Sequence, residues 1–163
     1  MPPIEDGRRR LRGRLSGPWA RAGAVFLVVF AADQASKRAI RGSIIPGEER
    51  RVLPGIQLVD TRNNGVAFGL FPNSQVVVAA LIGLALLALL VYFARHSTRR
   101  LIWLPTGMLM GGALGNILDR IRDGSVTDFI KLPLGWPPFN LADSSIVVAI
   151  LILALLLDRP RSE

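Results

Sequence analysis

The stretch "VVVAALIGLALLALLVYFA", residues 76–94, carries no charged side chain. Its length is close to the ~20 apolar residues with which a helix crosses the hydrocarbon core of a bilayer. The rest of the chain has a similar character, because 50% of its 163 residues are hydrophobic and the mean hydropathy is +0.39. The length favours a single domain. Together these features predict an integral membrane protein rather than a soluble domain.

Three further apolar segments flank this one, so we expect a membrane all-α fold of four transmembrane helices. The basic start of the chain precedes the first helix without a convincing cleavage site, which favours a retained helix over a secretory signal. Glycines in the third segment suit close helix–helix contact. The expected boundaries are a basic segment 1–18, helices 19–41, 76–94, 101–119 and 140–157, and connections 42–75 and 120–138.

Basic residues in the short flanking segments predict the orientation, since cytoplasmic segments are enriched in arginine and lysine. With four spans, both termini and the 95–100 connection then share the cytoplasmic side. The net charge of +8 is mostly this topology signal, so we expect no nucleic-acid partner. The arginines concerned are Arg8, Arg9, Arg10, Arg12, Arg14, Arg21, Arg95, Arg99, Arg100, Arg159 and Arg161.

The two connections on the other side carry their own signals. The stretch "RVLPGIQLVDTR", residues 51–62, mixes β-branched and polar residues around a Pro-Gly turn and predicts one or two short strands. The following "NNG" is a turn signal. In the second connection, Trp136 suits the membrane interface.

Polar side chains gather at one depth, at the outer ends of the predicted helices and in the outer connections. Ionisable groups inside a membrane are functional candidates, because each is costly to insert. Structural explanations stay open for several, such as an ion pair at i,i+4 spacing or a carboxylate that caps a helix. The residues are Asp33, Gln34, Lys37, Asn63, Gly65, Asn116, Asp119, Arg120, Asp128, Asn140 and Asp143.

The pair Asp128 and Asp143 favours a hydrolytic site. Two close carboxyl groups in a partly dry site hold one proton between them, so one is a base for water and the other an acid for a carbonyl. The chain has no cysteine, and its single histidine, His96, cannot build a multi-histidine zinc site. We therefore expect neither metal nor cofactor. A serine–lysine pair is disfavoured, because Ser36 and Lys37 are neighbours that do not face each other on a helix.

Four sequence motifs, in order, resemble those of the lipoprotein signal peptidase family, also called signal peptidase II. "DQASK" (33–37) resembles its Asp-Gln-x-x-Lys box, and "NNGVAF" (63–68) its Asn-x-Gly-x-Ala-Phe box. "GNILDR" (115–120) with "VTDF" (126–129) resembles its third box, and "FNLADS" (139–144) its Phe-Asn-x-Ala-Asp-Ser box. The first box alone is weak, but four boxes on four predicted spans are specific.

The resemblance implies an intramembrane aspartic endopeptidase of the bacterial cytoplasmic membrane, with its site near the extracytoplasmic face. It would cut diacylglyceryl-modified prolipoproteins before the lipidated cysteine, need no cofactor, contact membrane lipid and be blocked by globomycin-type cyclic peptides. The implied fold adds a small extracytoplasmic β-sheet cradle and a mobile loop or short helix, and a monomer is the simplest expectation.

The resemblance also implies roles for single residues. Asp128 and Asp143 would form the catalytic dyad. Five residues would bind and orient the substrate: Asn63, Gly65, Asn116, Arg120 and Asn140. Four would support the site: Asp33, Lys37, Asp119 and Ala142.

Two other classes of function stay open on the residues alone. A small ion-coupled transporter also places acidic and basic groups inside the membrane, but its polar groups should line both halves, whereas residues 146–157 carry none. A non-enzymatic anchor protein would use Arg120 and Trp136 at lipid headgroups, and it leaves Asp128 and Asp143 without a role.

Overall fold

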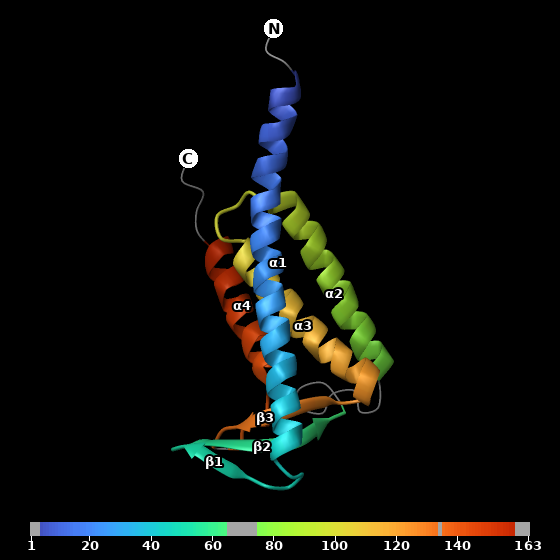
Figure 1. The fold of residues 1–163 in the computed structure, drawn as a ribbon, viewed down its shortest axis with the longest axis vertical. Helices are drawn as coiled ribbons and strands as arrows, with labels where there is room; N and C mark the ends of the chain where they lie inside the picture. Colours follow the sequence, from blue (N-terminus) through green and yellow to red (C-terminus); the bar gives the residue numbers. More distant parts are fainter. Residues whose placement is uncertain (1–3, 65–74, 134, 159–163) are drawn as a thin grey trace.

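A computed structural model of the protein describes residues 4–64, 75–133 and 135–158. It is mostly helical, and a small antiparallel sheet lies at one end of the helical bundle, opposite the start of the chain (Figure 1). The helix-rich fold with a small sheet agrees with the sequence prediction. The elements are α1 (Ile4–Ser43), β1 (Arg50–Leu53), β2 (Ile56–Asn63), α2 (Gln75–His96), α3 (Trp103–Asp123), β3 (Val126–Lys131) and α4 (Leu141–Leu157).

Helix α1 is longer than the predicted 19–41, because it begins at Ile4. The added turns are rich in arginine, which is a good helix former. Helix α3 likewise continues past the predicted end at 119 to Asp123. It ends at Gly124, whose φ of +67° lets its N–H cap the carbonyl of Arg120. The chain then turns directly into β3.

Helix α3 lies at the centre of the bundle, in contact with α1, α2 and α4. The predicted close approach at its glycines is confirmed. A Cβ atom at Gly107 would lie 2.5 Å from the carbonyl oxygen of Ala22 in α1, and one at Gly112 would lie 2.6 Å from that of Ala142 in α4. Both contacts are with backbone, which cannot yield as a flexible side chain can. The glycines therefore set the spacing of three helices.

Replacing Gly107 with alanine is expected to destabilise the fold by about 1–3 kcal/mol, because the added methyl group overpacks the contact with α1. The matched control is Gly23→Ala in α1, where nothing lies within 4 Å of the new Cβ. There the better helix propensity of alanine should raise stability by up to about 1 kcal/mol. Thermal unfolding of the two purified variants measures the difference. Equal unfolding temperatures would contradict this account of the glycines.

The sheet has the order β1-β2-β3, and both pairs are antiparallel. The predicted strands within 51–62 are thus present as β1 and β2, which are joined by a turn at Gly55 with φ +80°. The connection 120–138 was predicted without a strand, yet residues 126–131 form β3. The β-branched and aromatic residues of "VTDFIK" favour a strand. Pairing with β2 places Thr61 opposite Asp128.

One short contact positions the start of α4 beside β3. Phe139 forms an isolated antiparallel bridge with Ile130 of β3. The next residue, Asn140, is the N-cap of α4. The sheet thus brings a strand residue and a helix N-terminus together at the end of the bundle.

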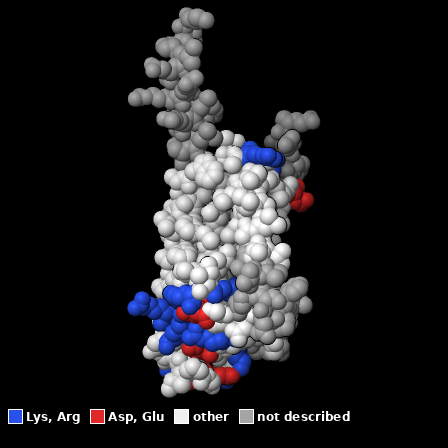
Figure 2. All heavy atoms as spheres, turned by 90° about the vertical axis from the view of Figure 1, so that its right-hand side faces the viewer, with Lys and Arg blue, Asp and Glu red and all other residues white. Residues whose placement is uncertain are grey.

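The outer surface of the helices is apolar. The view in Figure 2 shows a broad band without charged side chains between the two ends of the bundle, with most Lys, Arg, Asp and Glu side chains gathered at the end that carries the sheet and a smaller group at the other end. Large hydrophobic side chains are exposed on all four helices, among them Leu27, Leu84, Ile121 and Leu155. Judged on the described residues, none of the helices is both long enough and apolar enough to cross a membrane.

Candidate active site

Asp128 is near the middle of β3, and only 3% of its surface is exposed. Both of its carboxylate oxygens accept hydrogen bonds from amide side chains. The donors are Nδ2 of Asn63, at 2.9 Å, and Nδ2 of Asn140, at 2.7 Å. Asn63 ends β2, two residues after the strand partner of Asp128. The sheet register therefore brings the motif that begins at Asn63 to this carboxylate.

Burial raises the pKa of Asp128 from 3.8 to about 6. The low dielectric around a buried carboxyl group disfavours its charged form. The hydrogen bonds from Asn63 and Asn140 lower the pKa, because they stabilise the ionised form, while the negative charge of Asp143 raises it. This carboxyl group can thus bind or release a proton near neutral pH.

The raised pKa of Asp128 predicts a pH dependence of stability. In the unfolded chain the group returns to its ordinary pKa, so the folded protein binds the proton more tightly. The protonated group therefore contributes its full stabilisation below about pH 4 and loses it as the pH rises through about 6. The total loss in the free energy of unfolding is about 3 kcal/mol. Thermal unfolding at pH 5 and pH 8 should show a larger loss for the wild type than for Asp128→Asn. Equal losses would contradict the raised pKa.

Asp143 lies in the first turn of α4 and is partly buried. It forms a capping box with Asn140: its backbone N–H donates to Oδ1 of Asn140, at 2.9 Å, and its Oδ2 accepts from the backbone N–H of Asn140, at 3.2 Å. Its Oδ1 accepts a third bond from Nδ2 of Asn116 in α3, at 2.8 Å. Asn140 therefore contacts both aspartates, since its Nδ2 also holds Asp128.

The two roles of Asn140 can be separated by substitution. Serine is as good an N-cap as asparagine, but its short side chain cannot reach Asp128. Asn140→Ser therefore keeps the cap but loses the buried bond to Asp128, so it is expected to cost about 1–3 kcal/mol of stability and to impair any activity of the aspartate pair. Asn140→Ala should cost about 1 kcal/mol more, because it also loses the cap. Unfolding measurements with an activity assay check both outcomes. A fully active Asn140→Ser variant would contradict the orienting role.

Beneath the aspartates, Lys37 of α1 is completely buried between three polar groups. Its Nζ lies 2.8 Å from Oδ2 of Asp33 and 2.9 Å from Oδ2 of Asp119, and neither carboxylate is exposed. It also donates to Oδ1 of Asn116, at 2.8 Å. This last bond fixes the amide of Asn116 with its Nδ2 toward the second aspartate. Asp33 in turn accepts the backbone N–H of Ala142, at 3.0 Å, which ties α1 to α4.

Two further residues join this buried network: Gln34, which was among the predicted polar candidates but had no assigned role, and Arg41, which was not predicted. Nε2 of Gln34 donates to Oδ1 of Asp119, at 3.1 Å, and to Oδ2 of Asp33, at 3.2 Å. Arg41 extends to Oδ1 of Asp119, at 3.5 Å. The sequence could have predicted the place of Arg41, because positions 33, 37 and 41 are four residues apart and therefore share one face of the helix.

The structure brings nearly all of the predicted site residues together at the sheet end of the bundle. Arg120 lies one helical turn after Asn116, and its Nη1 donates to the carbonyl of Asn116 at 3.2 Å. Gly65 lies outside the described residues. The others that meet here are Asp33, Lys37, Asn63, Asn116, Asp119, Asp128, Asn140, Ala142 and Asp143.

A cavity of about 390 Å³ between α2, α3 and α4 leads to this site. Apolar side chains from all three helices line it, including Leu86, Ala113 and Ile146. Its polar wall is Asn116, the donor to Asp143. An apolar group in this cavity would therefore lie next to the second aspartate.

The arrangement suits acid–base chemistry on a polar bond. Asp128 and Asp143 are held by a shared asparagine, and amide N–H groups accompany both. Of two such carboxyl groups, one can keep a proton while the other is ionised, so the pair can take a proton from water and give one to a carbonyl oxygen.

Comparisons with known proteins agree with the motifs. Residues 25–158 match the family described as "Signal peptidase (SPase) II". A protein of Syntrophomonas wolfei named lipoprotein signal peptidase is 41% identical over 141 residues, covering 85% of this chain and 94% of that protein. A protein of the same name from Moorella thermoacetica is 41% identical over 139 residues, covering 84% and 92%. A solved structure described as a bacterial membrane enzyme has a TM-score of 0.79 at 29% identity, covering 87% of this chain and 91% of its own.

Proposed function

Because the chain belongs to the signal peptidase II family, we propose that it removes signal peptides from prolipoproteins by an aspartic mechanism at Asp128 and Asp143. The observation that carries this proposal is the pair of aspartates joined by Asn140, which bonds to both. The raised pKa of Asp128 supports it, because a shared proton near neutral pH is what such a pair needs.

In the proposed reaction, the ionised carboxylate of the dyad takes a proton from a water molecule. The water oxygen then attacks the scissile carbonyl carbon, while the protonated carboxyl group gives its proton to the carbonyl oxygen. In the second step the tetrahedral intermediate collapses and the C–N bond breaks. The leaving nitrogen receives a proton from one carboxyl group, and a hydroxyl group of the intermediate returns its proton to the other carboxylate as the product carbonyl forms. The two carboxyl groups end the cycle with one proton, as they began.

The surrounding amides have two proposed tasks. Asn63, Asn116 and Asn140 orient the aspartates through the bonds described above, and together with Arg120 they are placed to meet the peptide backbone of the substrate. Gly65 belongs to the same proposed set. Lys37 acts indirectly, because it holds the amide of Asn116.

We further propose that the helical bundle lies in the bacterial cytoplasmic membrane, with the sheet and the dyad at the extracytoplasmic face. The apolar surface of the helices supports this placement, because an extensive apolar surface marks a membrane or protein contact. The basic residues 95–100 then lie on the cytoplasmic side. A diacylglyceryl-modified substrate would approach from the bilayer, and the apolar cavity beside Asn116 offers it a route to the dyad.

The direct test is cleavage of a purified diacylglyceryl-modified prolipoprotein by the purified protein in detergent, with a divalent chelator in every reaction. We expect one cut before the lipidated cysteine, unaffected by the chelator and suppressed by globomycin. The unmodified prolipoprotein is the matched control and should be cut poorly. If the folded protein leaves the modified substrate intact while a reference peptidase cuts it, the proposed function is wrong.

A further inference from the structure

A shallow groove of about 460 Å³ runs along α2 at the end of the helix opposite the sheet. It is separate from the active-site cavity, which lies between α2, α3 and α4. Apart from its basic end, the groove is apolar, and Leu84 and Leu87 are 66% and 58% exposed. Helix α2 packs mainly on α3, and Phe93 near its end also contacts Trp19 of α1, at 4.7 Å between ring centres. The groove is lined by Leu84, Leu87, Ala88, Val91, Tyr92, Arg95 and His96.

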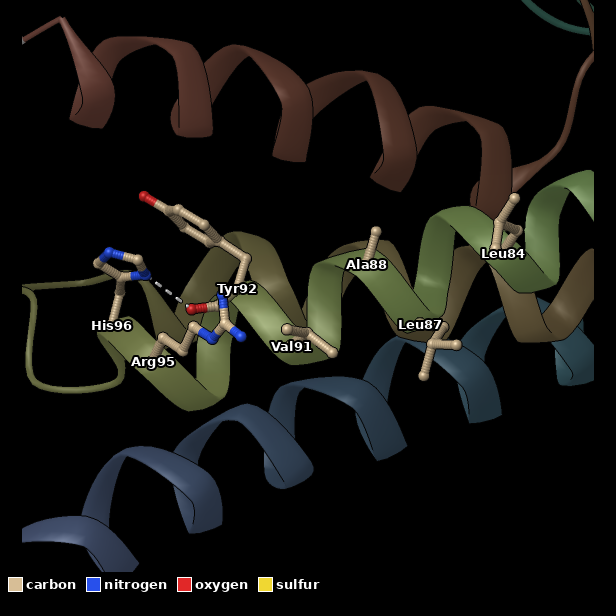
Figure 3. A pocket seen from close by; sticks show the side chains of 7 residues that line it. All are labelled: Leu84, Leu87, Ala88, Val91, Tyr92, Arg95 and His96. Atoms are coloured by element: carbon tan, nitrogen blue, oxygen red, sulfur yellow. Dashed lines mark hydrogen bonds between the residues drawn. The ribbon is translucent and has the colours of Figure 1, made fainter.

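The shape of the groove follows from helix geometry. Figure 3 shows two rows of side chains, one through Ala88 and Tyr92 and the other through Leu87 and Val91. Residues four apart on a helix form such ridges, and a groove lies between neighbouring ridges. The small side chain of Ala88 widens it. A slender apolar rod would fit lengthwise between the two rows.

One end of the groove is basic and aromatic. The ring of His96 stacks on Tyr92 at 4.4 Å, and its Nδ1 lies 2.9 Å from the carbonyl oxygen of Tyr92. Nη1 of Arg99 donates to the Tyr92 hydroxyl at 3.3 Å, which holds a second guanidinium at this end of the helix. Among the described residues, no carboxylate forms an ion pair with Arg95 or Arg99. Within that part of the chain, this end therefore presents positive charge without a counter-ion.

We propose that the groove binds one acyl chain of an anionic phospholipid, with the phosphate held at Arg95. From Leu84 to Arg95 the helix rises about 16 Å, which is about half of the ~30 Å hydrocarbon core and so matches one leaflet. Guanidinium groups pair well with phosphate. The inference rests on the proposed membrane placement but is independent of the peptidase chemistry.

A second copy of the chain fits the groove less well. Copies in one membrane share one orientation, and a two-fold pair through this face would bring each Arg95 toward the other. Two like charges would then meet at an apolar contact. An anionic headgroup supplies the opposite charge instead.

Native mass spectrometry of the purified protein tests the proposal by titration with phosphatidylglycerol and with phosphatidylcholine of the same acyl chains. We expect the wild type to bind the first lipid about tenfold more tightly, because the choline cation of the second lipid offsets the phosphate charge that Arg95 meets, and a contact between charged groups is worth about that much. Arg95→Gln should remove this preference. Val91→Trp, which fills the groove, should weaken the binding of both lipids.

Two variants serve as matched controls. Arg100→Gln removes the same charge from a neighbouring exposed position outside the groove, and Leu151→Trp adds the same ring to an exposed position on α4. Both should bind phosphatidylglycerol within about twofold of the wild type, a difference of about 0.4 kcal/mol. Equal affinity of the wild type for the two lipids, or equal losses for Arg95→Gln and Arg100→Gln, would overturn the proposal. A dimer that Val91→Trp disrupts would also overturn it, in favour of self-association.

The peptidase assay, run on the same preparations, keeps the two proposals apart. None of the substituted residues belongs to the aspartate site, so all of these variants should cut the substrate at the wild-type rate in detergent. If a groove variant loses the lipid preference but still cuts the substrate, the result bears on the lipid site and leaves the peptidase proposal unaffected. If the wild type shows the lipid preference but does not cut the substrate, the peptidase proposal fails and the lipid site stands.

Discussion

Replacing Asp128 or Asp143 with asparagine is expected to lower the cleavage rate about a thousandfold or more, because either change removes a group that must hold or accept a proton. The loss should appear in kcat more than in KM, since asparagine keeps the size of the side chain. The two losses should not add in the double variant, because each single change already disables the shared proton. Single-turnover cleavage of the modified prolipoprotein measures all three variants.

The fold should survive these changes, because asparagine retains one acceptor oxygen and carries no buried charge. Asp60→Asn is the matched control: it removes another buried carboxylate of the same sheet, one that pairs with Arg62 at 3.6 Å. That variant should keep at least about half of the activity, since it removes no proton carrier of the dyad. Substantial cleavage by either folded dyad variant would refute the aspartic mechanism.

Lys37→Met should have the largest effect on stability. The methionine side chain is of similar length, but it leaves the carboxylates of Asp33 and Asp119 buried without their shared cation. Removing one partner of a buried charged cluster costs about 3–5 kcal/mol. For a chain of this size, that lowers the unfolding temperature on the order of 10 °C. Thermal unfolding in detergent measures the shift.

A second variant tests whether uncompensated charge is the cause. Adding Asp119→Asn to Lys37→Met removes one of the two stranded charges, so it should recover a good part of the lost stability. The control is Lys131→Met, which removes the other lysine of the chain, an exposed one paired with Glu49. It should cost less than about 1 kcal/mol. If Lys131→Met and Lys37→Met are equally stable, the buried network does not stabilise the fold as described.

The sequence predicted the helices and the gathering of polar groups more fully than it predicted the sheet. Hydropathy alone located α2, since residues 76–94 lie within Gln75–His96. The spacing of Asp33 and Lys37 predicted an ion pair, which the structure contains at 2.8 Å. These features depend on neighbours along one helix, so local patterns reveal them.

The third strand and the wider hydrogen-bond network could not be read in the same way. β3 is only six residues long, and its partner β2 lies more than sixty residues earlier, as in the pair Thr61 and Asp128. The local pattern of "VTDFIK" does not predict which strand it pairs with. The double contact of Asn140 likewise requires β3 and α4 to meet in space. The motif predicted its presence at the site, but only the fold defines its bonds.

The bond from Ala142 to Asp33 has a consequence for how the protein is made. It joins residues 109 positions apart, so it forms only when the ribosome has released almost the whole chain. A nascent chain that ends after β3 contains Lys37, Asn116 and Asp128, but it lacks Asn140 and the second aspartate. The proposed peptidase therefore has no partly active precursor during translation. Its proteolytic activity begins only when the last helix joins the other three.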